Sequence, residues 1–363
     1  MVKAAVWYKY GEPAVIEEVD IDPVGPGQVK VRMVAAPICG SDIHCVKGEH
    51  GIGELPGVAG HEAAGIVEEI GEGVTYVKPG DRVLISLVHA GCGQCYNCIM
   101  GNPNWCDDFK FQFKTQSCFT LKDGRRPSSM LGPYASFAEY TLAPERALVK
   151  IEEGVPMEVA GVIACGVISG YGAVINAAKV RPLESVAVIA AGGVGLNTIQ
   201  TARLVGAHPI IAIDPNEMKL EKALEFGATH VVNPKKEDQV ARVREITKGR
   251  GVDYCFVTCA GIEIKRDAFM MLSRKGLEII IGHGHKEMMS AWDAQELISG
   301  RSLAGSAMGR TKTRVDIPNI MELYKAGRLK LDELISNKYP LEKINEAMKE
   351  VEEGKVLRNV ITF

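Results

Sequence analysis

Apolar and polar positions follow different patterns in the two halves of the chain. Residues 1–90 form short runs rich in Val, Gly and Pro, and apolar residues alternate with polar ones over Gln28–Val34. Such alternation is typical of a strand with one buried face, and Gly65–Ile70 and Asp81–Ile85 are further strand candidates. Because helical periodicity is scarce in this part, we expect a β-rich domain of the small-barrel type.

From Pro156 the pattern changes to continuous apolar strands that alternate with amphipathic helices. This alternation predicts a parallel, doubly wound sheet and therefore an α/β protein. The elements expected here are the strand Ser185–Ala190, a helix up to Val205, the strand Pro209–Asp214, a helix over Asn216–Phe226, the strand His230–Val232, a helix over Val240–Lys248, and the strands Tyr254–Val257 and Leu277–Ile281. We expect three segments, 1–165, 166–307 and 308–363, of which the last holds helices and a final strand.

Composition narrows the class of protein only slightly. The net charge is −3, with 46% hydrophobic and 24% charged residues, so nothing indicates a nucleic-acid or membrane-surface partner. Met1–Val6 is predicted to be a strand rather than a signal peptide, and no run is apolar and long enough to span a bilayer. We therefore expect a cytoplasmic protein, in which ten cysteines point to metal binding or catalysis before disulfides.

Four cysteines stand close together, in a Cys-x2-Cys-x2-Cys-x7-Cys pattern. Four thiolates in one short segment can close a tetrahedral zinc site without an open position, which is a structural site. Disulfides would need an oxidising compartment. A bacterial iron–sulfur run needs a three-residue gap and a following Pro, whereas Asp107 follows here. The ligands of the favoured zinc site are Cys92, Cys95, Cys98 and Cys106.

A second set of candidate metal ligands is spread over the first half of the chain. His61 lies within Gly60–Gly65, between glycines that permit tight turns at the start of a β-like run. A lone His–Glu pair would prove little, but Cys39 and Cys165 can supply two thiolates. One His and two Cys with an open fourth position form the ligand set of a catalytic zinc site.

The segment Gly60–Glu62, with glycines at positions 65 and 71 and Val74, resembles the signature of the zinc alcohol dehydrogenases of the medium-chain dehydrogenase/reductase superfamily. The resemblance extends from about Val2 to Phe363, and the long insertion after the cysteine cluster is similar to that of the liver-type and formaldehyde-dehydrogenase-like branch. It implies a GroES-like catalytic domain, to which the C-terminal segment returns, and a Rossmann cofactor domain. It also implies the four-cysteine zinc site and reversible oxidation of a primary or secondary alcohol with hydride transfer to NAD.

The same resemblance implies roles for residues around the expected catalytic zinc. Ser41 resembles the hydroxyl that accepts the substrate proton, and His44 resembles the base that delivers it to solvent through the nicotinamide ribose. Asp42 resembles the carboxylate that orients His61, and Glu62 resembles a residue that approaches the metal. Simpler interpretations stay open, namely a turn hydroxyl for Ser41, an exposed loop histidine for His44 and a structural ion pair for Glu62.

A glycine-rich turn and a helix follow the first strand of the second pattern, and a helix N-terminus at this place can hold a pyrophosphate. In the Gly-x-Gly-x-x-Gly fingerprint, Ala190 replaces the first glycine, which is tolerable only if the turn needs no positive φ. Asp214 ends the next strand and would suit the ribose hydroxyl of NAD while repelling the extra phosphate of NADP. An ordinary helix cap is the alternative. The residues of the turn are Gly192, Gly193, Val194 and Gly195.

The resemblance implies further cofactor contacts. Lys219 would support the ribose, and Arg358 would contact the pyrophosphate. Ser169 matches a position near the nicotinamide but could equally be an inert helix hydroxyl, and Ile281 is a further candidate for cofactor binding. Gly40 stands where many relatives have an Arg or His for the same phosphates, so that contact is missing here.

The substrate pocket is the part that the sequence defines least. By rough alignment Val88, Phe111 and Met130 would line it, an apolar set that suits an alcohol with a hydrocarbon, allylic or aryl body. The polar stretch Leu121–Ser129 lies in a long segment that covers the substrate entrance in the resembled branch, or is a solvated excursion. Its two arginines would provide a basic entrance, so a conjugated substrate, such as a CoA thioester or a glutathione adduct, is an alternative.

Three further points concern function and assembly. His283 and His285 follow a strand at the edge where ligands bind in such sheets, so they are candidates to touch cofactor or substrate. A redox-inactive protein that binds NAD and zinc would require the loss of a zinc ligand or of Ser41, and all four residues are present. The resemblance implies two zinc ions per chain, a small-molecule substrate and a homodimer or homotetramer.

Overall fold

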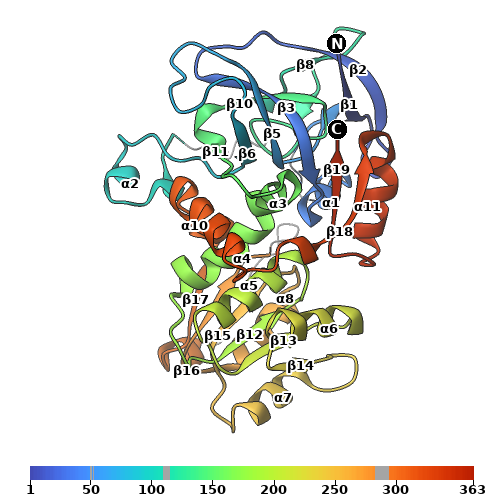
Figure 1. Cartoon of the computed structure of the whole chain (residues 1–363). Helices are drawn as coiled ribbons and strands as arrows, with labels where there is room; N and C mark the ends of the chain where they lie inside the picture. Colours follow the sequence, from blue (N-terminus) through green and yellow to red (C-terminus); the bar gives the residue numbers. More distant parts are fainter. Residues whose placement is uncertain (50, 52, 109–114, 283–293) are drawn as a thin grey trace. The chain divides into compact units, whose positions relative to one another are not determined.

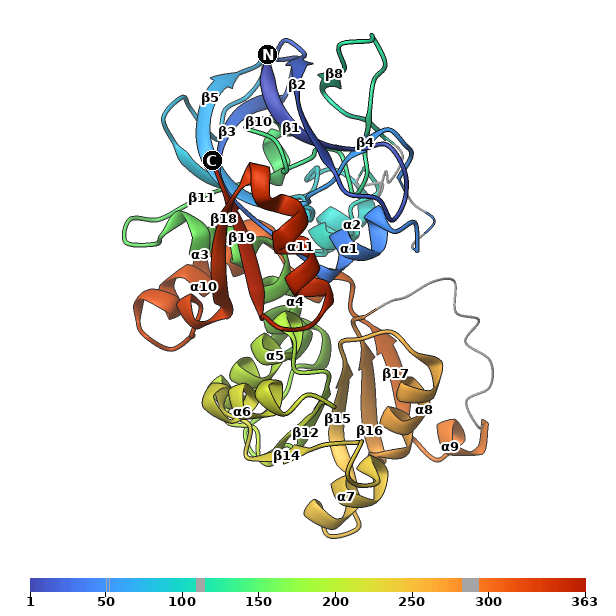
Figure 2. The same ribbon diagram turned by 90° about the vertical axis from the view of Figure 1, so that its right-hand side faces the viewer.

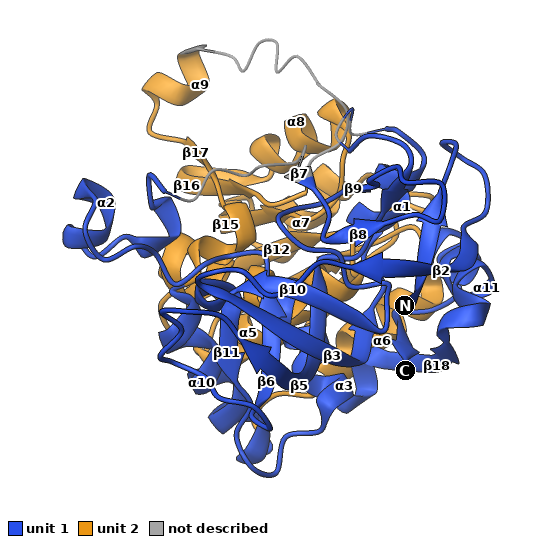
Figure 3. Cartoon of the chain, turned by 90° about the horizontal axis from the view of Figure 1, so that it is seen from above, with its two compact units in different colours: residues 1–165, 312–327, 331–363 blue, residues 166–311, 328–330 orange. Residues whose placement is uncertain are grey.

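The computed structural model describes residues 1–49, 51, 53–108, 115–282 and 294–363. These residues divide into two compact units, which Figure 3 colours separately. The first unit comprises Met1–Cys165, Lys312–Gly327 and Leu331–Phe363, and the second comprises Gly166–Thr311 and Arg328–Lys330.

Two β-sheets form much of the first unit (Figure 1). The strands of the larger sheet are β3 (Gln28–Pro37), β5 (Glu62–Ile70), β6 (Arg82–Ser86), β10 (Tyr140–Pro144), β11 (Leu148–Lys150), β18 (Ile335–Pro340) and β19 (Arg358–Thr362). Their order is β11-β6-β5-β3-β19-β18, with β10 also paired to β3. The strands of the smaller sheet are β1 (Val2–Trp7), β2 (Val15–Ile21), β4 (Gly57–Val58), β7 (Thr115–Gln116), β8 (Phe119–Thr120) and β9 (Ser128–Ser129). Their order is β7-β9-β4-β1-β2-β8.

The alternation in β3 buries one side of that strand. Val29, Val31 and Met33 belong to the main core cluster of the first unit, and burial of a side chain of this size stabilises the fold by about 1.5–3 kcal/mol. Strand β19 pairs antiparallel with β3, with Val360 opposite Pro37, so the end of the chain completes a sheet that begins near its start. The helices of this unit are α1 (Gly40–Val46), α2 (Tyr96–Ile99), α3 (Met157–Val162), α10 (Thr313–Lys325) and α11 (Ile344–Glu352).

A parallel sheet forms the centre of the second unit. Its strands are β12 (Val186–Ile189), β13 (Ile210–Ile213), β14 (His230–Val232), β15 (Val252–Val257), β16 (Leu272–Ile280) and β17 (Ser302–Gly305). The order is β14-β13-β12-β15-β16-β17, and all neighbouring strands are parallel. The order reverses beside β12, as in a doubly wound fold, so the predicted sheet type is confirmed.

Helices cover both faces of this sheet. The helices of the second unit are α4 (Ile168–Gly172), α5 (Gly193–Leu204), α6 (Glu217–Phe226), α7 (Gln239–Ile246), α8 (Ile262–Met270) and α9 (Ala294–Ile298). Figure 2 shows α5 and α6 on one face and α8 on the other. Val243 of α7 and Phe269 of α8 share a core cluster with Ile189 and Ile211 of the sheet, so these strands are buried as their continuous apolar runs predict.

One helical segment among the described residues, Met157–Ala178, is long and apolar enough to cross a membrane. Its apolar stretch is 89% buried inside the structure, as is typical of a core helix. The segment is not a regular α-helix, because Ile163–Val167 forms a π-helical turn between α3 and α4. Such turns are rare and occur frequently at functional sites, and this one contains Cys165.

Candidate active site

Four buried side chains meet in the interior of the first unit. They come from the residue before α1, from the start of β5 and from the π-helical turn. One potential ligand atom from each side chain lies within 4.8 Å of the others. The fold thus brings the three expected ligands of the catalytic metal together, with a carboxylate beside them. The four residues are Cys39, His61, Glu62 and Cys165.

Only glycine fits directly before His61. Gly60 has a φ of +95°, and a Cβ at this position would lie 2.2 Å from Ser136 Oγ and 2.9 Å from Phe137 N. The Tyr134 hydroxyl, which is buried, donates a hydrogen bond to the carbonyl oxygen of His61 at 2.5 Å. The close approach of the two segments therefore fixes the backbone that carries His61. The sequence contains no local pattern that would have identified Tyr134 as a neighbour of the site.

The Asp42 carboxylate connects the segments that carry the donors. It is fully buried and accepts hydrogen bonds from the backbone N–H groups of Cys39 at 2.9 Å and Gly60 at 3.2 Å. It also lies 3.0 Å from Nδ1 of His61. Because an ionised carboxylate only accepts hydrogen bonds, Nδ1 carries the proton. Nε2 of His61 then faces the other donors, 3.3 Å from Cys165 Sγ.

Hydrogen bonds and charges within this cluster shift the pKa values of its donors. The hydrogen bond from Cys165, with His61 and the charge of Arg358, holds the pKa of the Cys39 thiol well below its usual range, although burial opposes this shift. Burial would lower the pKa of His61, but Asp42 and Cys39 outweigh it and raise that pKa well above its ordinary value. Metal binding to such ligands displaces their protons. Two sulfurs and one imidazole nitrogen, buried and converging, are a donor set that fits Zn²⁺.

Glu62 is paired with a residue from the other end of the chain. Its Oε1 contacts Nη2 of Arg358, and the two side chains are 0% and 6% exposed. Within the described part of the chain, Oε2 of Glu62 has no hydrogen-bond partner. Burial raises the pKa of Glu62 above its ordinary value, and the positive charge of Arg358 opposes this shift and favours the carboxylate. The expected contact between Arg358 and a pyrophosphate stays a prediction.

Helix α1 carries both residues that are expected to transfer the substrate proton. Ser41 and His44 lie three residues apart, so they are neighbours on one face of the helix. Nδ1 of His44 lies 2.5 Å from Oε2 of Glu49, and these side chains are 45% and 47% exposed. Glu49 is not among the residues predicted from the sequence. The glycine at position 48, which commonly follows a helix end, was the signal that could have placed it near His44.

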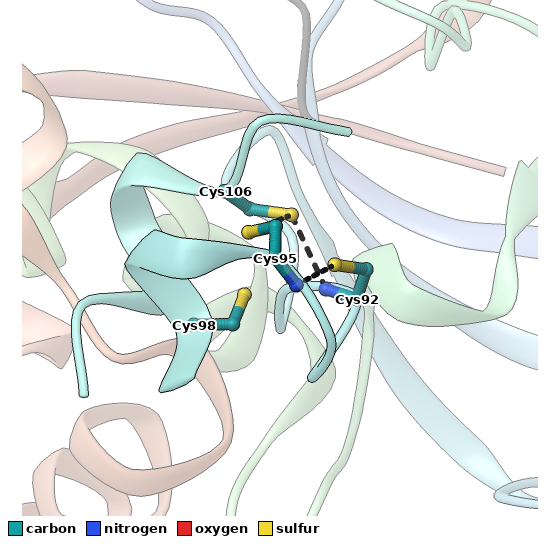
Figure 4. A group of neighbouring side chains, drawn as sticks. All are labelled: Cys92, Cys95, Cys98 and Cys106. Carbon is teal, nitrogen blue, oxygen red and sulfur yellow. Dashed lines mark hydrogen bonds between the residues drawn. The ribbon is translucent and has the colours of Figure 1, made fainter. Parts of the chain in front are cut away.

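The four cysteines of the second predicted metal site also meet, as Figure 4 shows. Their sulfur atoms lie within 4.8 Å of one another, and all ten cysteines of the chain are free, which excludes the disulfide alternative in this structure. Backbone N–H groups of Gln94 and Cys95 donate to the Cys92 sulfur at 3.4 and 3.3 Å. They lower the pKa of Cys92 to about 6. Four converging sulfurs, one stabilised as a thiolate, fit a closed zinc site.

The glycine-rich turn of the second unit lies between β12 and α5. A Cβ on Gly195 would lie 1.9 Å from the carbonyl oxygen of Ala190, so only glycine lets this helix approach the strand. A Cβ on Gly192 would meet nothing within 4 Å, which leaves space at a helix N-terminus that attracts phosphate. Asp214 is buried after β13 and accepts a hydrogen bond from the N–H of Ala191 at 2.8 Å. The turn and the carboxylate are thus joined, which fits a dinucleotide.

Ala190 adopts the left-handed conformation, with a φ of +70°. For a residue other than glycine this conformation costs roughly 1–2 kcal/mol. The Thr258 hydroxyl donates to the carbonyl oxygen of Ala190 at 2.8 Å, and the Ala190 N–H donates to Ile213 at 2.8 Å. The condition under which alanine would be tolerated, a turn without positive φ, is therefore not met, and the turn is strained.

The remaining predicted residues have ordinary structural surroundings. Ser169 donates a hydrogen bond to the sulfur of Met308 at 3.8 Å, and the N–H of Ile281 donates to Val257 after β16. Lys219 lies on α6. The two described residues of the predicted pocket are buried in the first unit, namely Val88 and Met130. The predictions that fall outside the described residues concern Phe111, His283 and His285.

Two family models match the chain, "Alcohol dehydrogenase GroES-like domain" over residues 25–153 and "Zinc-binding dehydrogenase" over residues 193–326. A geraniol dehydrogenase from Carpoglyphus lactis is 36% identical over 369 residues, 99% of this chain and 97% of the relative. An NDMA-dependent alcohol dehydrogenase from Amycolatopsis methanolica is 33% identical over 378 residues, 99% of this chain and 98% of the relative. The crystal structure of a benzyl alcohol dehydrogenase from Acinetobacter calcoaceticus matches with a TM-score of 0.91 and 32% identity, over 100% of this chain and 99% of its own.

Proposed function

Since the chain belongs to the zinc-dependent alcohol dehydrogenases of the medium-chain dehydrogenase/reductase superfamily, we propose that it oxidises a free primary or secondary alcohol reversibly, with NAD as hydride acceptor. The observation that carries this proposal is the buried cluster of Cys39, His61 and Cys165, in which Asp42 orients the imidazole. Assignment to the liver-type branch stays a prediction.

The residues of the cluster would hold the catalytic zinc. Zinc on Cys39, His61 and Cys165 would supply Lewis acidity and lower the pKa of an alcohol hydroxyl at the open position. The chain itself fixes the donors, because Asp42 bonds to two backbone segments and Tyr134 holds the carbonyl of His61. A second, structural zinc on the four cysteines would stabilise the segment around α2, giving two zinc ions per chain.

Proton transfer would run along helix α1. The Ser41 hydroxyl would accept the substrate proton and pass it to His44 on the same helix face. The half-exposed side chain of His44 supports this role, because the last acceptor of the proton must reach solvent. A general base of this kind contributes roughly 10²–10⁴-fold to a rate.

The second unit would bind NAD through the turn that begins α5. Phosphates would lie at the N–H groups of that helix, and the Asp214 carboxylate would select an unphosphorylated ribose. NAD would supply the hydride acceptor. We therefore expect NAD to be preferred strongly over NADP. A preference for NADP would refute the proposed contact between Asp214 and the ribose.

Two arginines of the loop 121–129 bear on the substrate class. Arg125 donates to the Asp123 carboxylate at 2.8 Å, and Arg126 forms an ion pair with Asp22 and donates to Ser117 O at 3.0 Å. Because both guanidinium groups already have anionic partners, they favour a free alcohol over a CoA or glutathione conjugate. The names of the relatives, for geraniol and benzyl alcohol, lead us to propose an allylic or aryl primary alcohol. We also propose a cytoplasmic homodimer or homotetramer.

The experiment that tests this function is NADH formation by the purified protein across a panel of alcohols. The panel contains aliphatic, allylic, aryl and cyclic alcohols, the glutathione adduct of formaldehyde and a hydroxyacyl-CoA. We expect turnover with the free alcohols, fastest for the allylic and aryl members. Turnover confined to a conjugate would instead establish a CoA thioester or glutathione adduct as the substrate class. The absence of turnover with two zinc ions bound would point to a substrate outside the panel or to a cofactor that is not released.

A further inference from the structure

Helix α1 ends in a backbone motif that brings His44 and Glu49 together. The N–H of Gly48 donates to Cys45 O at 2.9 Å, and the N–H of Glu49 donates to His44 O at 2.9 Å. Gly48 has a φ of +78°, and a Cβ there would lie 3.0 Å from the ring of Tyr10. These two hydrogen bonds around a left-handed glycine define a Schellman cap, so the position of Glu49 is set by the backbone.

In a Schellman cap, the residue after the glycine commonly makes an apolar contact with the residue five positions earlier. Here that pair is polar, with Nδ1 of His44 2.5 Å from Oε2 of Glu49. Because a carboxylate offers only acceptors, the contact requires a proton on Nδ1. It therefore leaves the lone pair of neutral His44 on Nε2, the nitrogen that does not face Glu49.

We propose that Glu49 is a positioning residue for proton transfer, in that it fixes His44 in the tautomer whose Nε2 is basic. This inference rests on the proposed function of His44. In the step concerned, the O–H bond of the relay hydroxyl breaks and an N–H bond forms at Nε2. Glu49 then faces the positive charge that develops on the ring, and the proton leaves from Nε2 to water.

A neighbouring ion pair provides a matched control. Lys47 and Glu352 form an ion pair at the same end of α1, with side chains 36% and 44% exposed. Replacement of Lys47 by Ala removes this ion pair and a cation whose charge also acts on Glu49, but it keeps the carboxylate that faces His44. We expect Lys47→Ala to leave hydride transfer and the His44 tautomer unchanged.

The first arm of the test is spectroscopic. Nitrogen-15 NMR of the zinc-loaded protein, with His44 assigned by comparison with His44→Gln, reports which ring nitrogen carries the proton. We expect protonated Nδ1 and unprotonated Nε2 in the native protein, a mixture of tautomers in Glu49→Ala, and retention of the native tautomer in Glu49→Gln, whose amide oxygen still accepts. An unprotonated Nδ1 in the native protein would overturn the proposal.

The second arm is single-turnover hydride transfer with benzyl alcohol and NAD. We expect Glu49→Ala to slow hydride transfer by about two- to fivefold, the size typical of a half-exposed charged pair. The KM for benzyl alcohol, from steady-state rates, should be unchanged. Glu49→Ala should have no effect in a His44→Gln background. An equal loss in both backgrounds, or no loss in either, would contradict the proposal while leaving the relay role of His44 intact. If His44→Gln itself is as fast as the native protein, the relay role fails, and this inference fails with it.

Discussion

The guanidinium group of Arg358 and the carboxylate of Glu62 form an ion pair in the interior of the first unit, although the two residues are 296 positions apart in the sequence. Strand β5 supplies Glu62 and strand β19 supplies Arg358, and both strands pair with β3. The last strand of the chain therefore neutralises a carboxylate beside the metal ligands. The environment of the metal ligands therefore depends on the pairing of the C-terminal strand β19 with β3.

Removal of one member of this pair should destabilise the fold strongly. We expect Arg358→Met to lower the free energy of unfolding of the zinc-loaded protein by about 3–5 kcal/mol, because a buried carboxylate loses its partner. The double variant Arg358→Met with Glu62→Gln should recover part of this loss. Urea unfolding measures both, and Lys3→Met, which removes the exposed pair with Glu342, is the control with a much smaller expected change. Equal losses in the free energy of unfolding for Arg358→Met and Lys3→Met would show that the buried pair contributes no more to stability than the exposed pair.

Loss of one cysteine from the four-cysteine cluster should remove one metal ion. We expect two zinc ions per native chain and one in Cys98→Ala, which should also unfold at a lower temperature, since structural zinc contributes directly to folding. Metal analysis with thermal unfolding tests this expectation. Cys118→Ala, which removes a thiol outside both clusters, should keep both ions. Retention of two ions and of native stability by Cys98→Ala would refute the structural site.

Relief of the strain at Ala190 should stabilise the second unit. We expect Ala190→Gly to raise the free energy of unfolding by about 0.5–1 kcal/mol, because the gain from a left-handed glycine exceeds its larger entropy loss on folding. The opposite change is expected for Ala241→Gly on the exposed side of α7, about 0.5–1 kcal/mol of destabilisation. Denaturant unfolding of the two variants gives the comparison. A destabilised Ala190→Gly would mean that the contacts of the turn, and not its φ, decide its stability.

Burial of His89 should make stability depend on pH below neutrality. Burial, with the charge of Arg146, lowers the pKa of His89 to about 4 from its ordinary 6.5. Between these values the unfolded chain binds a proton that the folded chain does not, so stability falls as the pH falls from about 6.5 to about 4. Over that window the native protein should lose up to about 3 kcal/mol more than His89→Gln does. Parallel curves for the two proteins, from urea unfolding at each pH, would disprove this contribution.

The metal donors and the cofactor turn could be predicted from the sequence, because the patterns that indicate them are local or chemically restrictive. The cysteine spacing indicates one zinc site, and the glycines around His61 indicate the other. Cys39 and Cys165 were assigned to the second site only because thiolates are zinc ligands. Glycines at positions 192 and 195 identified the turn before α5 in the same way. The parallel sheet followed from continuous apolar runs between helices, whose burial on both faces depends on no single long-range contact.

Contacts that depend on tertiary structure could not be predicted from the sequence. The pair of Glu62 and Arg358 requires knowledge that β19 lies beside β3. The φ of +70° at Ala190 belongs to the turn between β12 and α5, and an alanine in the sequence does not indicate a left-handed conformation. The contact between Glu49 and His44 depends on how α1 ends, which a glycine indicates but does not fix. These residues surround the predicted donors, and their roles follow from packing.

The catalytic metal site is tested by the zinc content and the NADH formation of Cys165→Ala, measured beside the native protein. We expect two zinc ions and alcohol-dependent NADH formation in the native protein. In the variant we expect one remaining zinc ion, held by the four-cysteine cluster, and no detectable NADH formation. Two zinc ions and native turnover in Cys165→Ala would contradict the claim that Cys39, His61 and Cys165 form the catalytic metal site.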